Sequence, residues 1–110
     1  MHTQKRRVVI TGMGTLTPIG HGLAAFWEGL MSGTSGVGRI TRFDASDLAT
    51  QIAAEVKDFN PDDYMDRRDA KRMDRFAQFA VAATRMAIED AGLDLDSVDR
   101  DRVGVIIGSG

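Results

Sequence analysis

Two glycines near the N-terminus, Gly12 and Gly14, are the first residues of this sequence that could do chemistry. They follow a short apolar run at 7–11 and precede an amphipathic segment. The order strand, glycine loop and helix begins many ligand-binding α/β units. A dinucleotide fingerprint needs a third glycine three positions after Gly14, where this chain has Thr17. A fragment of a dinucleotide-dependent oxidoreductase therefore stays open only as an alternative.

Two other glycine-loop chemistries lack their residues here. No Gly-Lys-Ser or Gly-Lys-Thr occurs, as the phosphate loop of nucleotide hydrolases requires. No Gly-x-Ser-x-Gly stands between a strand and a helix, so the hydrolase nucleophile elbow is missing. We therefore expect Gly12 and Gly14 to serve backbone geometry, through a positive φ or a close approach of two chain segments.

A second candidate group is a basic cluster made of Arg67, Arg68, Lys71, Arg72 and Arg75. The last four are spaced i, i+3, i+4 and i+7, so a continuous helix would place them on one face. One interpretation is a solvated face with weak ion pairs to the aspartates nearby. The other is a docking patch for an acidic partner. The helix macrodipole does not favour cations at a helix N-terminus, which moves the interpretation toward docking.

Composition excludes several classes of function. The chain has 110 residues, 43% hydrophobic, which matches one domain with a core. Its formal net charge of −2 argues against a general nucleic-acid binder. No apolar run approaches the roughly 20 residues of a membrane span or fits a signal peptide, so we expect a cytoplasmic protein. Without cysteine, and with only His2 and His21 as histidines, we expect no metal and no cofactor.

The elements that must position these residues follow from hydrophobic periodicity and from capping residues. The pattern predicts an α/β fold with strands at 7–11, 51–56 and 102–108, and a surface connection over 33–50. It predicts helices at 21–32, 61–65 and 69–91, ended in two cases by Gly33 and Gly92. Alanines in the longest helix indicate close packing of its second half. A compact domain rarely ends directly after a central strand, so we expect the domain to be incomplete at Gly110.

Taken together, these motifs resemble the N-terminal quarter of a β-ketoacyl-acyl-carrier-protein synthase of the elongating synthase II type. Each matching motif is weak alone, but they recur in order and spacing across all 110 residues. They are Arg6-Arg7-Val8-Val9-Ile10-Thr11-Gly12-Met13-Gly14, Pro18-Ile19-Gly20, Trp27, Ser35-Gly36, Phe43-Asp44, Lys57-Asp58-Phe59-Asn60, Lys71-Arg72-Met73-Asp74 and Gly108-Ser109-Gly110.

The resemblance implies that residues 1–110 are an incomplete, N-terminal portion of a thiolase-like layered α-β-α-β-α fold. It also implies decarboxylative Claisen condensation of malonyl-carrier protein with an acyl thioester. The family's nucleophilic cysteine, its two histidines and its lysine all lie downstream of Gly110. We therefore expect no catalytic residue in this chain and no condensing activity from it alone.

The resemblance also assigns the basic cluster a partner. The family's carrier-docking residues match Arg68, Lys71 and Arg72, and its acyl carrier proteins are strongly acidic. A homodimer is implied for the full-length protein, with no nucleic-acid and no membrane partner. Two further interpretations remain open: a non-catalytic module that binds carrier protein, and a fragment of a polyketide-type ketosynthase.

Overall fold

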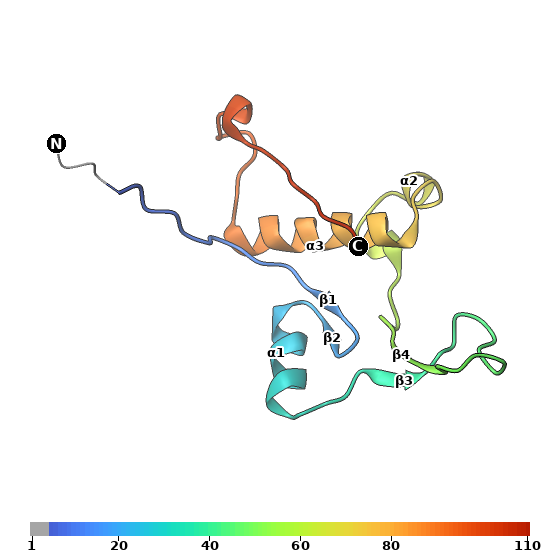
Figure 1. The fold of residues 1–110 in the computed structure, drawn as a ribbon. Helices are drawn as coiled ribbons and strands as arrows, with labels where there is room; N and C mark the ends of the chain where they lie inside the picture. The colour runs from blue at the N-terminus through green and yellow to red at the C-terminus, as the bar shows by residue number, and fades with distance from the viewer. Residues whose placement is uncertain (1–4) are drawn as a thin grey trace.

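A computed structural model describes residues 5–110 and arranges them around one long helix, α3 (Figure 1). The strands form two antiparallel pairs, β1 with β2 and β3 with β4. In chain order the elements are β1 (Leu16–Thr17), β2 (Gly20–His21), α1 (Leu23–Met31), β3 (Val37–Arg39), β4 (Ile52–Ala54), the 3₁₀ turn η1 (Pro61–Asp63), α2 (Arg67–Ala70), α3 (Arg75–Ala91) and the 3₁₀ turn η2 (Arg100–Arg102). Within residues 5–110, no helix combines the length and the apolarity needed to cross a membrane.

The arrangement is open. The Cα radius of gyration is 18.0 Å, whereas about 13 Å is typical of a compact domain of this length. The accessible surface is 9312 Å², against about 6,000 Å² for a compact protein of the same mass. Large apolar side chains therefore face solvent along much of the chain.

Helix α1 confirms the helix predicted at 21–32 to within two residues at its start and one at its end. Gly33, with φ of 66°, follows the helix in the left-handed conformation expected of it. Its predicted apolar stripe is covered only in part, because Trp27 and Met31 are 64% and 70% exposed. The helix is held to the β1–β2 turn through Gly29, where a Cβ would meet the carbonyl oxygen of Ile19 at 2.9 Å.

Strands β3 and β4 form a hairpin with Val37 opposite Ala54 and Arg39 opposite Ile52. The strand predicted at 51–56 is thus confirmed in its centre, whereas β3 lies inside the predicted surface connection. Glu55 organises the joining loop, because its carboxylate accepts the backbone N–H of Thr41 and, at 2.8 Å, the Thr41 hydroxyl. That hydroxyl hydrogen bond is the largest factor lowering the pKa of Glu55.

A small aromatic core forms around Phe59, which is only 8% exposed. Asp58 before it has φ of 54°, a left-handed conformation that aspartate tolerates. The Phe59 ring stacks on Tyr64 at 5.7 Å and meets the edge of Phe79 at 4.9 Å, between ring centroids. His21 also packs edge-on against Phe59, at 6.3 Å. This core joins β2, η1 and the start of α3.

The helix predicted at 69–91 is wrong in its first turn, because α2 ends at Ala70 and α3 begins at Arg75. Asp74 stands at the N-cap position with extended backbone angles of −67° and 158°, and its side chain makes no capping hydrogen bond. The C-terminal end is confirmed, since Gly92 has φ of 58°. The second half of α3 is half-buried rather than buried, because little of the chain covers it.

The strands predicted at 7–11 and 102–108 are wrong for the isolated chain. Both segments run without a strand partner within residues 5–110, crossing or following α3 (Figure 1). Val8 is 93% exposed and Ile106 is 97% exposed. A strand is defined by its hydrogen-bonded neighbour, so an apolar β-branched run without one remains an extended segment.

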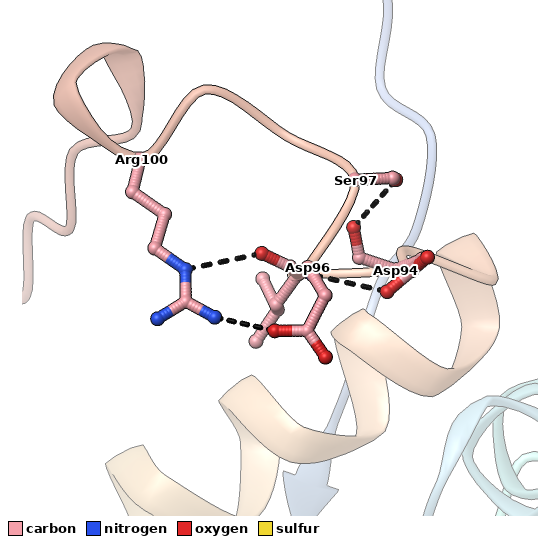
Figure 2. A network of polar contacts seen from close by, with 5 residues as sticks. Asp94, Asp96, Ser97 and Arg100 are labelled. Atoms are coloured by element: carbon pink, nitrogen blue, oxygen red, sulfur yellow. Dashed lines mark hydrogen bonds and ion pairs between the residues drawn. The ribbon is translucent and has the colours of Figure 1, made fainter.

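The acidic loop between α3 and η2 is an ordered turn (Figure 2). Asp94 accepts the backbone N–H of Asp96 at 3.0 Å and, through its carbonyl, the Ser97 hydroxyl at 2.9 Å. Arg100 pairs with the Asp96 carboxylate and donates to the Leu95 carbonyl at 3.2 Å. These local bonds turn the chain, and the following segment runs back along α3 (Figure 1).

Candidate functional site

The three cations singled out by the sequence, Arg68, Lys71 and Arg72, extend from one short stretch of backbone. We name residues 67–73, which comprise α2 and the turn after it, the basic turn. The Asp66 carboxylate begins α2 by accepting the Arg68 backbone N–H at 2.8 Å. After α2, the backbone N–H of Lys71 donates to Arg67 and that of Arg72 donates to Asp69.

The prediction that these cations share one helical face is wrong, because the helix is interrupted between Ala70 and Arg75. Arg68, Lys71 and Arg72 remain together on the basic turn, but Arg75 does not join them. The Arg75 guanidinium lies 5.5 Å from the Phe59 ring centroid and 5.0 Å from that of Phe79. Its Nη2 donates to the Val56 carbonyl at 3.1 Å. Partial burial, and secondarily the charge of Arg42, lowers the pKa of Arg75.

The side chains of Arg68, Lys71 and Arg72 are exposed to solvent. Within residues 5–110, no carboxylate lies within 4.0 Å of any of the three. The neighbouring Arg67 differs, since its Nε lies 4.0 Å from the Asp62 carboxylate. A shallow hollow of about 760 Å³ is lined by Asp66, Arg67, Arg68, Asp69 and Lys71. Unpaired cations around an open surface suit an acidic macromolecular partner better than an enclosed small ligand.

Gly12 and Gly14 confirm the expectation of a close approach between chain segments. A Cβ on Gly14 would overlap the carbonyl oxygen of Ala83, and one on Gly12 would lie 2.6 Å from the Ala91 Cβ. The Met13 N–H between them donates to the Asp90 carboxylate at 3.0 Å. These glycines pack against the C-terminal half of α3 rather than at a helix N-terminus, where a pyrophosphate would bind, which argues against the dinucleotide alternative.

Gln78 belongs to the site and was missed by sequence reasoning. Its Nε2 donates to the Ala70 carbonyl at 2.8 Å and approaches the Met73 carbonyl at 3.5 Å. A glutamine inside an amphipathic helix is ordinarily expected to face solvent. The carbonyl that Gln78 binds belongs to α2, a different helix. No sequence pattern therefore pointed to it.

The described residues offer binding chemistry rather than covalent chemistry. The chain contains no cysteine, and residues 5–110 hold no group of three or more metal-ligating side chains. The His21 ring packs edge-on against Phe59. The basic turn, with its exposed cations, is the candidate binding surface considered below.

Comparison with known proteins gives consistent matches over almost the whole chain. Residues 5–110 match the family model for the β-ketoacyl synthase N-terminal domain. The 3-oxoacyl-[acyl-carrier-protein] synthase 2 of Synechocystis sp. is 53% identical over 107 residues, 97% of this chain and 26% of that protein. The synthase of the same name from Coxiella burnetii is 50% identical, with 97% and 26% covered. That from Staphylococcus aureus strain COL is 47% identical, with 98% and 26% covered.

A solved structure shares the fold. It is described as the ishigamide ketosynthase/chain length factor and superposes with a TM-score of 0.78 at 44% sequence identity. The superposition covers 84% of this chain and 23% of that one. The mixed helices and strands seen here are therefore the N-terminal part of the ketosynthase fold, as predicted. The chain spans about a quarter of the length of the curated relatives it matches.

Proposed function

The chain belongs to the β-ketoacyl synthase family, and we propose that it is the N-terminal portion of a 3-oxoacyl-[acyl-carrier-protein] synthase of fatty-acid chain elongation. The whole synthase would condense malonyl-carrier protein with an acyl thioester. In that reaction the malonyl carboxylate leaves as CO₂, a carbon–carbon bond forms to the acyl carbonyl, and the thiolate that held the acyl chain departs. Residues 1–110 would supply scaffold and part of the surface that receives the carrier protein.

The observation that carries the docking proposal is the set of three cations on the basic turn that make no ion pair within residues 5–110. Arg68, Lys71 and Arg72 are exposed, and no carboxylate of those residues lies within 4.0 Å of them, although Asp66 and Asp69 line the same hollow. Exposed cations steer an oppositely charged macromolecule and orient it during association. An acidic acyl carrier protein has the chemistry to match them.

The catalytic groups would come from other parts of the synthase. With no cysteine among its 110 residues, this chain has no thiol to take an acyl group. We therefore expect no condensation by the chain alone, and thioester condensation by it would overturn this division of roles. A homodimer and a cytoplasmic location are further parts of the proposal, and both rest on the family alone.

A polyketide-type ketosynthase is the second candidate, because the superposed solved structure is a ketosynthase/chain length factor. The synthase 2 relatives favour chain elongation, since the Synechocystis protein is 53% identical and the solved ketosynthase 44% identical. Product analysis of the whole synthase with an acyl-carrier protein and malonyl-carrier protein would separate them. A single 3-oxoacyl extension supports chain elongation, whereas repeated extension without reduction supports the second candidate.

Charge reversal in the whole synthase tests the docking proposal. We expect Arg68→Glu, Lys71→Glu and Arg72→Glu together to raise the KM for carrier-bound substrates about 100-fold, because attraction becomes repulsion. The rate with carrier-free N-acetylcysteamine thioesters should not change. Arg102→Glu, at an exposed position outside the basic turn, is the control. An unchanged KM for carrier substrates in the triple variant would overturn the docking role.

A further inference from the structure

We propose that Gln78 is a positioning residue for carrier recognition: its side-chain amide holds the backbone from which the three cations extend. This inference rests on the proposed docking role of the basic turn. Gln78 is uncharged and lies on α3, so a docking surface defined by its charged residues alone would not include it.

The basic turn is too short to be stable as an isolated helix. Helix α2 has only four residues, far fewer than the about 12 that an isolated helix needs to persist in water. Asp66 caps the Arg68 N–H at 2.8 Å. At the other end, the Arg67, Asp69 and Ala70 carbonyls accept backbone N–H groups of the turn itself, those of Lys71, Arg72 and Met73, so within the turn only these local bonds hold it.

Gln78 supplies the connection to the long helix. It lies near the start of α3, whose 17 residues make it the most regular element of the chain. Its Nε2 donates to the Ala70 carbonyl at 2.8 Å, and Ala70 is itself only 4% exposed. The same carbonyl accepts the Met73 backbone N–H at 3.2 Å. One buried oxygen thus joins α2, the turn after it and α3.

The position of this bond matters for the cations. Ala70 stands between Arg68 on one side and Lys71 and Arg72 on the other. Arginine and lysine side chains are long and lose much rotamer freedom when bound. If the backbone also had to be ordered on binding, the entropic cost would be larger still. Without the amide of Gln78, the turn would sample other conformations, and part of the binding free energy would be spent on ordering it.

Replacing Gln78 tests the geometry of the basic turn without changing its charge, whereas replacing Arg75, the other residue that holds the start of α3, would change both. Arg75 also ties the start of α3 to the core, through Val56 and two aromatic rings. Replacing Arg75 would alter the charge beside the docking surface as well as the packing. Replacing Gln78 by methionine removes the donor and keeps the net charge and the approximate length of the side chain.

The experiment is steady-state kinetics of the whole synthase carrying Gln78→Met, with acyl-carrier protein varied. We expect the carrier KM to rise about five-fold, the effect of one neutral hydrogen bond. We expect kcat, the rate with carrier-free thioesters and the salt dependence of KM to stay unchanged, because the charges are the same. Gln51→Met is the matched control, since the Gln51 amide likewise donates to loop carbonyls, those of Ser46 and Leu48, away from the basic turn.

Gln78→Asn gives an independent variant, because its amide is one methylene too short to reach the Ala70 carbonyl. A carrier KM within two-fold of wild type in both variants overturns the proposal. Parallel loss of carrier-free activity in both variants also overturns it, because the role would then be general stability. If the triple charge reversal leaves the carrier KM unchanged as well, the proposed docking function fails and not only the role of Gln78.

Discussion

The basic turn and the two apolar end segments of this chain differ in how many contacts fix their backbone. The basic turn is short and polar, yet Asp66 caps one end of α2 and Gln78 ties the other to α3. The segments at 7–11 and 103–107 are apolar and β-branched, yet they have no strand partner within residues 5–110. Local side-chain hydrogen bonds thus hold the proposed docking surface within the chain, whereas the apolar segments have backbone groups that no strand of the described residues pairs with.

The largest expected effect concerns the aromatic core around Phe59, which joins β2, η1 and the start of α3. We expect Phe59→Ala to lower the free energy of unfolding of the chain by about 3–5 kcal/mol, because a buried aromatic ring would leave a cavity. Phe43→Ala is the control, since Phe43 is 57% exposed, and should change it by less than about 0.5 kcal/mol. Urea unfolding measures both. Equal effects of the two substitutions would show that Phe59 is not the centre of the core.

The second effect concerns the attachment of the N-terminal segment to α3. We expect Gly14→Ala to lower the free energy of unfolding by about 1–3 kcal/mol, since its Cβ would overlap the Ala83 carbonyl oxygen. Gly104→Ala is the matched control, because a Cβ there meets nothing within 4 Å. It should be neutral or slightly stabilising. Thermal melting of the two variants measures the difference, and a tolerated Gly14→Ala would contradict the close approach.

The third effect separates shape from charge on the basic turn. Asp66→Asn keeps an oxygen that can cap the Arg68 N–H and removes a negative charge beside the cations. We expect it to lower the carrier KM of the whole synthase about two-fold, by weakening repulsion of an acidic partner. Asp66→Ala removes the same charge together with the cap, which is worth about 1 kcal/mol. Its KM should therefore exceed that of Asp66→Asn, and equal values would show that the cap is irrelevant to binding.

The smallest effect concerns the C-terminal segment. Ile106 is 97% exposed, so we expect Ile106→Ser to change the free energy of unfolding of the chain by less than about 0.5 kcal/mol. Amide hydrogens at 104–107 should exchange nearly as fast as in an unfolded peptide, unlike those in the middle of α3. Strong protection at 104–107 would mean that this segment has a backbone partner within the chain.

Where structure follows from local signals, the sequence was sufficient to predict it. The helix predicted at 61–65 is confirmed in its start and not in its length: it is the 3₁₀ turn η1 over Pro61–Asp63, where the Asn60 side chain accepts the Asp62 N–H at 3.2 Å. Gly33 and Gly92 end their helices in the left-handed conformation, with φ of 66° and 58°. The family and the fold class were also predicted, because many weak motifs in a fixed order are specific together.

Where the structure depends on residues far apart in the sequence, the spacing of residues along the chain led to wrong predictions. The spacing of Arg68, Lys71, Arg72 and Arg75 fits one helical face, but the helix ends at Ala70 and the backbone is extended at Asp74 before α3 begins. Arg75 then packs on two aromatic rings whose approach no local pattern encodes. The contact of Gln78 with the Ala70 carbonyl was missed for the same reason, since it depends on how α2 folds back against α3.

The salt dependence of carrier binding tests the central claim most directly, that Arg68, Lys71 and Arg72 recognise an acidic carrier protein. The affinity of the whole synthase for acyl-carrier protein would be measured across a range of salt concentrations, with wild type and with all three residues changed to glutamine. We predict an affinity that falls steeply with salt in the wild type and is nearly independent of salt in the variant, because screening acts only on charges that are present. The same steep dependence in both proteins would contradict the account.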